Sequence, residues 1–261
     1  MIIKILTFIK TLFLGQENSR PVNTLRPAIK NQCLNVKRIW KNTHYKDFGL
    51  ERIIRLILAL LLFIFPGLYI RHFSGKMGLL SRKLWIELYV IFKFILPIVF
   101  FKLDLTNELF VTIVCGYMAL ETIVYLASLI FLSNEFAGPI SHRRSILTLF
   151  INYVEVCLNY AVIYSYCNIT IENFFNKPLT TDVQSIYFSF VTSATVGYGD
   201  ITPIDSFGQC LVISQIILFL VFVVLFINFF AAKVQESTYY NVKPTYRDKW
   251  QNPISKRKDD L

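Results

Sequence analysis

The sequence predicts an all-α integral membrane protein. Hydrophobic residues make up 54% of the 261 positions and only 17% are charged, against about 25% charged residues in a typical soluble domain. The apolar residues are concentrated in segments of about 17 to 25 residues, the length that a helix needs to cross a bilayer. Since lipid offers the backbone no hydrogen-bond partners, such segments are expected to be helical.

Four segments are predicted to span the bilayer, because each is long enough and mostly apolar. They are Leu84–Phe101, Glu108–Leu132, Ser145–Cys167 and Phe207–Ala232. A fifth apolar segment, Ile53–Ile70, contains Arg55 and is interrupted by Pro66-Gly67. About 13 uninterrupted residues remain before the proline, which is typical of an interfacial or re-entrant segment. We therefore expect Ile53–Ile70 to lie in the inner leaflet or dip into it.

The net charge of +10 is unevenly distributed. Basic residues are concentrated in four stretches: Arg20 to Lys46, Arg71 to Lys83, Arg143-Arg144 and Lys256 to Lys258. In a soluble protein such stretches would suggest a nucleic-acid partner, but in a membrane protein they indicate cytoplasmic segments in contact with anionic lipid. The N-terminal region, residues 1–51, is therefore predicted to be cytoplasmic, and no nucleic-acid partner is expected.

The first residues, MIIKILTFIKTLFLG, favour an interfacial helix over a cleaved signal peptide. Lys10 interrupts the apolar run, and no small-residue cleavage site follows. The five cysteines form no CxxC pair, so neither a disulfide framework nor a metal site is indicated. The sequence also has no nucleophile or phosphate-binding constellation, so we do not expect an enzyme.

Residues 168–206, between the last two predicted spans, carry the most information. A polar stretch is followed by a helix that opens at Thr181, because Thr181-x-x-Gln184 is a capping box ahead of an apolar run. At about 1.5 Å per residue this helix is about 20 Å long, too short to cross. The loop SATVGYGDITP comes next, and a second capping box, Ser206-x-x-Gln209, opens the last span. The predicted order is span, short re-entrant helix, glycine loop, span.

Gly197 and Gly199 give this loop unusual backbone freedom. An ion that enters lipid must exchange its water shell for protein oxygens, and backbone carbonyls that all face one way can supply them. The stretch TVGYGD, Thr195 to Asp200, resembles the selectivity filter of potassium channels. The resemblance extends over residues 141–236. It implies that permeant K⁺ is bound by Thr195, Val196, Gly197, Tyr198 and Gly199.

The same resemblance implies supporting residues and an oligomeric state. Tyr187 and Phe188 match the pore-helix aromatics that face the filter tyrosine, and Thr192 and Gly208 match further family positions. Asp200 would hold the outer end of the filter. Because one chain carries one loop and the family's ion sites use rings of four, a homotetramer is implied. The predicted fold is a tetrameric pore module, residues 141–236. Two or three further transmembrane or membrane-associated helices, residues 52–140, precede it, and a short cytoplasmic tail, 237–261, follows.

Three positions depart from the family pattern. Val191 stands where some members carry a glutamate that pairs with the filter aspartate, so Asp200 lacks that partner. Ala194 stands where threonine is frequent. Phe219 falls near the position of the inner-helix hinge glycine of many members, so bending there should be harder.

Charged residues inside a membrane are costly and usually pair. Lys93 and Glu121 lie at comparable depths in adjacent antiparallel spans, which predicts either an ion pair or two separate water-lined sites. Glu155 shares one helix face with Asn152 and Asn159. This polar stripe either packs against other helices, the interpretation we favour, or senses a gating stimulus.

Two further groups of residues bear on gating. Gln215 and Asn228 of the last span either face the ion cavity or pack between helices. Arg52 and Arg55 have the spacing of a voltage sensor only once, so steep voltage gating is not expected.

The function that the sequence favours is passive, potassium-selective permeation in a plasma membrane or a bacterial inner membrane. One alternative is a poorly selective cation pore, against which Tyr198 argues. Another is a non-conducting or accessory membrane subunit of a potassium transport system. Related transporters fuse four degenerate pore loops in one chain, whereas this chain has one full motif. No cofactor is implied besides permeant K⁺.

Overall fold

A computed structural model describes residues 27–42, 49–76, 79–132 and 142–236. Within these ranges the chain is helical apart from its connections and one isolated β-bridge, so the predicted all-α fold is confirmed. In this part of the chain, four helical segments are long and apolar enough to cross a membrane, and their bounds are close to those of the four predicted spans. They are Leu84–Lys102, Leu109–Phe131, Ser145–Thr170 and Ser206–Ile227. The predicted interfacial helix at the N-terminus and the tail, 237–261, lie outside the described residues.

The described residues up to Ile91 form the first of two compact units. Its helices are α2 (Ala28–Lys41), α3 (Gly49–Leu61) and α4 (Pro66–Gly75). Side chains join α2 to α3: Gln32 Nε2 donates a hydrogen bond to the Ala59 carbonyl over 2.8 Å, and Arg52 Nη2 donates to the Trp40 carbonyl over 2.7 Å. One of the two arginines considered as voltage-sensing residues therefore bonds to the backbone of α2.

The interruption predicted at Pro66-Gly67 is present. Helix α3 ends at Leu61 and α4 begins at Pro66, with an angle of 66° between them. Pro66 occupies the start of α4, where its missing N–H removes no helical hydrogen bond. Together the two helices are apolar enough for one broken span or a re-entrant segment. Their position in the inner leaflet therefore stays a prediction.

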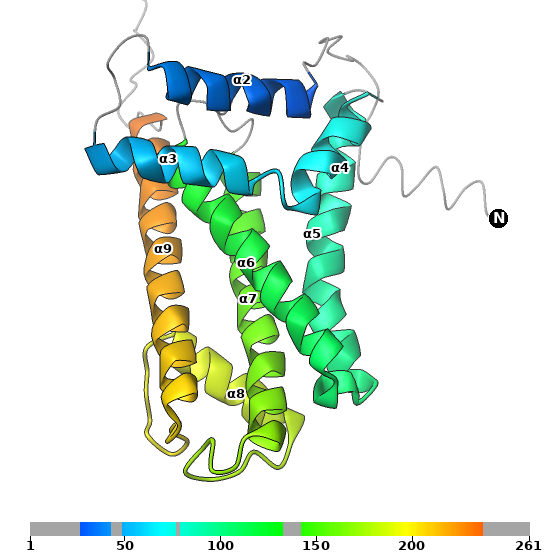
Figure 1. Ribbon diagram of the computed structural model, residues 1–261, viewed down its shortest axis with the longest axis vertical. Coiled ribbons are helices and arrows are strands. Elements are labelled where there is room, and N and C mark those ends of the chain that lie inside the picture. The colour runs from blue at the N-terminus through cyan, green and yellow to red at the C-terminus, as the bar shows by residue number, and fades with distance from the viewer. Residues whose placement is uncertain (1–26, 43–48, 77–78, 133–141, 237–261) are drawn as a thin grey trace, which may run out of the picture. The chain divides into compact units, whose positions relative to one another are not determined.

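The described residues from Phe92 to Glu236 form the second unit. It contains the last part of α5 (Leu79–Lys102), the short 3-10 helix η1 (Leu105–Asn107), α6 (Leu109–Phe131), α7 (His142–Thr170), α8 (Asp182–Ser193) and α9 (Ser206–Glu236). Helix α7 is the central element, because α6, α8 and α9 all pack against it (Figure 1). Buried aromatic residues such as Tyr164, Phe174 and Phe222 fill the space between these helices.

The start of α9 corrects one prediction. The capping residue is Asp205 and not Ser206: Asp205 Oδ2 accepts hydrogen bonds from the backbone N–H of Phe207 over 2.7 Å and of Gly208 over 3.3 Å. A carboxylate is the better cap here because it also interacts favourably with the positive end of the helix dipole. The N-cap is therefore one residue earlier than predicted, and the predicted capping box is not formed, because the residue three positions after Asp205 is Gly208, which has no side chain to return the bond.

Candidate functional site

The short helix α8 begins at the predicted cap. Thr181 Oγ1 accepts a hydrogen bond from the Gln184 N–H over 3.4 Å. The second hydrogen bond of the capping box, made by the Gln184 side chain, differs from the usual pattern. Gln184 Oε1 accepts from the backbone N–H of Thr180 over 2.7 Å and not from that of Thr181. Both residues predicted to open α8 therefore take part in fixing its first turn.

The C-terminal end of α8 is closed by a Schellman motif. Its two hydrogen bonds run from the Thr195 N–H to the Thr192 carbonyl and from the Val196 N–H to the Val191 carbonyl, each over 3.0 Å. Thr195 has φ +54°, a left-handed conformation that is rare for a β-branched residue and usually falls to glycine. The first two residues of the glycine loop are thus bonded directly to the helix before them.

Left-handed and ordinary backbone conformations alternate along the loop. After Thr195, positive φ recurs at Gly197, +59°, and Gly199, +77°, whereas Val196 and Tyr198 lack it. A Cβ added at either glycine would meet no heavy atom within 4 Å. Conformation and not space therefore requires glycine at these two positions.

Apolar side chains of the loop face outward in the single chain. Val196 is 51% exposed and Tyr198 is 69% exposed. The Tyr198 ring stacks on Tyr187 of α8, with centroids 6.4 Å apart and an angle of 2° between the ring planes. Desolvation, and then the nearby Asp200 carboxylate, raise the pKa of Tyr187. Asp200, which has no glutamate at residue 191 to pair with, thus lies close to Tyr187.

The remaining predicted pore-helix residues lie on other faces of α8. Phe188 is buried and packs edge-on against Tyr164 and Phe175, with centroids 4.9 and 4.8 Å away. Thr192 is half-buried, and its carbonyl accepts the Schellman bond from Thr195. Tyr187 is therefore the aromatic residue stacked on the loop tyrosine, whereas Phe188 belongs to the core.

A segment before α8 holds the outer end of the loop. The Asn176 N–H donates to the Thr202 carbonyl, and Asn176 Oδ1 accepts from the Thr202 N–H, both over 2.9 Å. Asn176 Nδ2 also reaches the Asp200 carbonyl at 3.4 Å. No sequence pattern indicates this clamp, because Asn176 and Thr202 are distant in the chain and meet only in the fold.

Gly208 lies in the first turn of α9 against this same segment. A Cβ at residue 208 would approach Phe174 Cζ and Pro203 Cβ to 2.9 Å each. Real Cβ atoms essentially never come so close, so glycine is required here by close packing. The small residue predicted early in the inner helix thus lets α9 approach the segment that follows the loop.

The amide of Gln215 lies between helices. Nε2 donates to the Ser189 carbonyl and Oγ, and Oε1 accepts from the Tyr164 hydroxyl, all over 2.9 Å. Ser189 Oγ in turn donates to the Cys157 carbonyl over 2.6 Å. Gln215 was expected either to face the ion cavity or to pack between helices, and in the structure it packs between helices. The side chain of Asn228 lies outside the described part.

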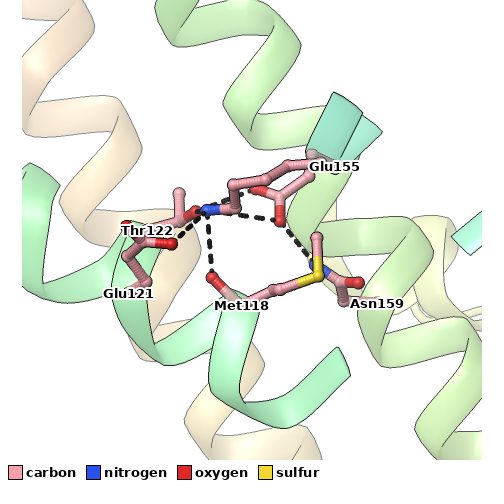
Figure 2. A network of polar contacts seen from close by, with 6 residues as sticks. Met118, Glu121, Thr122, Glu155 and Asn159 are labelled. Atoms are coloured by element: carbon pink, nitrogen blue, oxygen red, sulfur yellow. Dashed lines mark hydrogen bonds and ion pairs between the residues drawn. The ribbon is translucent and has the colours of Figure 1, made fainter. Parts of the chain in front are cut away.

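Lys93 and Glu121 come together, and Glu155 joins them. Lys93 Nζ lies 3.5 Å from Glu121 Oε2 and 3.7 Å from Glu155 Oε1. It also donates hydrogen bonds to Thr122 Oγ1 and to the Met118 carbonyl. The three charged side chains of this ion cluster, Lys93, Glu121 and Glu155, are buried. Figure 2 shows their polar contacts from close by.

Two neutral groups complete the surroundings of Glu155. Its carboxylate accepts from Asn159 Nδ2 over 2.6 Å and from Thr122 Oγ1 over 2.9 Å. The predicted polar stripe therefore packs against α5 and α6. The sequence predicts only the pair of Lys93 and Glu121, and Glu155, which lies within another predicted span, is the additional member.

Comparison with known families agrees with this arrangement. A family described as "Ion channel" matches residues 153–236, from the middle of α7 through α8 and the loop to the end of α9. No curated protein and no solved structure matches the chain. The C-terminal part of this multi-pass membrane protein is therefore an ion channel domain, preceded by additional helices, and the family matched there is one of ion channels and not of enzymes.

Proposed function

We propose that the chain is a potassium-selective channel, in which K⁺ permeates passively through a homotetrameric pore. The observation that carries the proposal is the backbone of residues 195–199, where positive φ recurs at every second residue directly after a capped helix that is too short to span. Such alternation allows successive carbonyls to face the same side, in contrast to a β-strand. Carbonyl oxygens in rings of four can replace the hydration shell of K⁺.

The surface of the single chain supports assembly around the loop. Val196 and Tyr198 are apolar or aromatic and more than half exposed, so further copies are needed to cover them. Four copies would bring four loops to one axis. The carboxyl ends of four α8 helices would then point at the ion path, where their dipoles favour a cation.

The structure also suggests how the loop is supported without a glutamate at residue 191. Tyr187 stacks on Tyr198 and lies near Asp200, and Asn176 holds the backbone beyond it. These contacts come from the pore helix and from the segment before it. They favour K⁺ selectivity over the poorly selective cation pore, because they restrain the tyrosine that sets the pore width.

Reconstitution of the full chain in liposomes tests the proposal. K⁺ efflux should be much faster than Na⁺ efflux, and Gly199→Ala should abolish the difference because alanine is strained at φ +77°. Gly116→Ala is the matched control, since an added Cβ there meets nothing within 4 Å. Equal K⁺ and Na⁺ fluxes would indicate the poorly selective pore. No flux from a correctly folded protein would indicate the accessory subunit.

Cross-linking of the purified chain in membranes tests the oligomeric state separately. A ladder that ends at four subunits is expected, and a ladder that ends at two would contradict the four-fold pore. The basic segments are proposed to contact anionic lipid on the cytoplasmic side of a plasma membrane or bacterial inner membrane.

A further inference from the structure

We propose that Gln215 is a positioning residue, which fixes the pore helix α8 to the inner helix α9 and so holds the loop 195–199 in its conducting geometry. This inference rests on the proposed channel function and deepens it. Gln215 touches neither the loop nor the ion path described above. It acts through Ser189, the residue of α8 to which it is bonded.

The orientation of the Gln215 amide is determined by its partners. The Ser189 carbonyl has no proton to give, so the group facing it must be the NH₂ of Gln215. Ser189 Oγ donates its single proton to the Cys157 carbonyl and is therefore free to accept the second N–H of the amide. Oε1 then faces the Tyr164 hydroxyl, which donates to it. Each donor of this group of residues thus faces an acceptor. The joint between the helices, formed by Gln215, Ser189 and Tyr164, therefore has one arrangement of hydrogen bonds.

Burial makes this arrangement difficult to break. Gln215 is 1% exposed and Tyr164, Ser189 and Cys157 are at most 1% exposed. No water can replace a lost partner at such positions without an opening of the helices, and a buried polar group without a partner is costly. Helices α7, α8 and α9 are therefore expected to move together at this level.

Ser189 is connected to the loop by a continuous hydrogen-bonded path. It lies within the last two turns of α8, and the Schellman bonds then tie Thr195 and Val196 to the end of that helix. A small rotation of α8 would consequently displace the first two carbonyls of the loop. A second hydrogen bond from α8 to α7, between Ser193 Oγ and Tyr153 Oη over 3.1 Å, also holds the end of α8 in place.

The position of Gln215 in α9 extends the proposal to movements of the inner helix. Gln215 lies one helical turn before Phe219, where the sequence has no hinge glycine. With bending disfavoured there, a movement of α9 reaches α8 through Gln215. The inner helix would thus act on the filter itself.

Two measurements on the full chain in liposomes test the proposal: the ratio of K⁺ to Na⁺ flux, and hydrogen exchange of the amides of residues 189–196. Gln215→Leu removes all three hydrogen bonds at similar volume. We expect the flux ratio to fall, and the Thr195 and Val196 amides to exchange about tenfold faster, which corresponds to the loss of a buried hydrogen bond. Gln209→Leu, at an exposed residue of the same helix, should change neither quantity.

Each outcome decides the question. A folded Gln215→Leu tetramer with both the flux ratio and the exchange rates within about twofold of the wild type would overturn the proposal. If Gln215→Leu does not assemble, Gln215→Glu takes its place, because it keeps the acceptor for Tyr164 and loses the two donors to Ser189. Failure of that variant to assemble as well would also overturn the proposal, since Gln215 would then serve folding and not the loop.

The two proposals can fail separately. If the wild-type chain carries no K⁺, the channel function is wrong, yet the exchange measurement still decides whether Gln215 holds α8. If the wild type is K⁺-selective and Gln215→Leu is equally selective and equally protected, only the present inference fails.

Discussion

Replacing Lys93 with methionine should destabilise the protein strongly. Lys93 Nζ lies 3.5 Å from Glu121 Oε2 and 3.7 Å from Glu155 Oε1. With an effective dielectric constant of about 20, each contact corresponds to roughly 4–5 kcal/mol of attraction before desolvation. Without Lys93, the carboxylates of Glu121 and Glu155 remain buried with no cation beside them. Removing one partner of a buried ion pair typically costs about 3–5 kcal/mol of stability. We expect a loss of that size in the free energy of unfolding.

The free energy of unfolding in mixed detergent micelles, measured by SDS titration, checks this expectation. The variant Lys93→Met/Glu121→Gln/Glu155→Gln removes all three charges and should recover most of the loss, because a neutral replacement leaves no unbalanced charge. Lys102→Met, at the exposed end of the same helix, is the matched control and should change stability by less than about 0.5 kcal/mol. Lys93 would not balance the two carboxylates if Lys93→Met is as stable as the wild type, or if the triple variant is no more stable than Lys93→Met.

Three further substitutions test the contacts around the loop. Gly208→Ala should destabilise the chain by about 1–3 kcal/mol in the same SDS titration, because its Cβ would meet Phe174 and Pro203 at 2.9 Å; equal effects of Gly208→Ala and Gly116→Ala would contradict the close packing. Asn176→Ala should speed hydrogen exchange of the Thr202 amide about tenfold, since it removes the 2.9 Å bond to Oδ1; an unchanged rate would show that the clamp is not formed. Thr181→Ala should lower stability by about 1 kcal/mol through loss of the α8 cap, whereas Thr180→Ala, which keeps its backbone bond to Gln184, should have the smaller effect; the reverse order would place the cap elsewhere.

Features set by local sequence were predictable. The four long helices follow from the length of the apolar segments, and the break before Pro66 follows from proline chemistry. The start of α8 after Thr181 is likewise local, because the capping contact joins residues 181 and 184 of the same turn. The start of α9 was displaced by one residue because Asp205 and Ser206 are both good caps, and only the structure distinguishes them.

Features that depend on packing were not predictable. Glu155 of α7 lies 3.7 Å from Lys93 of α5, a contact between two different helices that no periodicity within either helix reveals. The clamp of Asn176 on Thr202 links two connections that are separated by a whole helix. Thr195 adopts a left-handed conformation that its β-branched side chain disfavours. The hydrogen bonds at the end of α8 impose that conformation, so residue preference alone would have missed it.

We propose that the backbone of residues 195–199 selects K⁺. The most direct test is the reversal potential of the reconstituted full chain with K⁺ on one side of a planar bilayer and Na⁺ on the other. We predict a large potential in the direction of K⁺ selectivity, lost in Gly199→Ala and retained in Gly116→Ala. A reversal potential near zero in the wild-type protein would show that this backbone does not select K⁺.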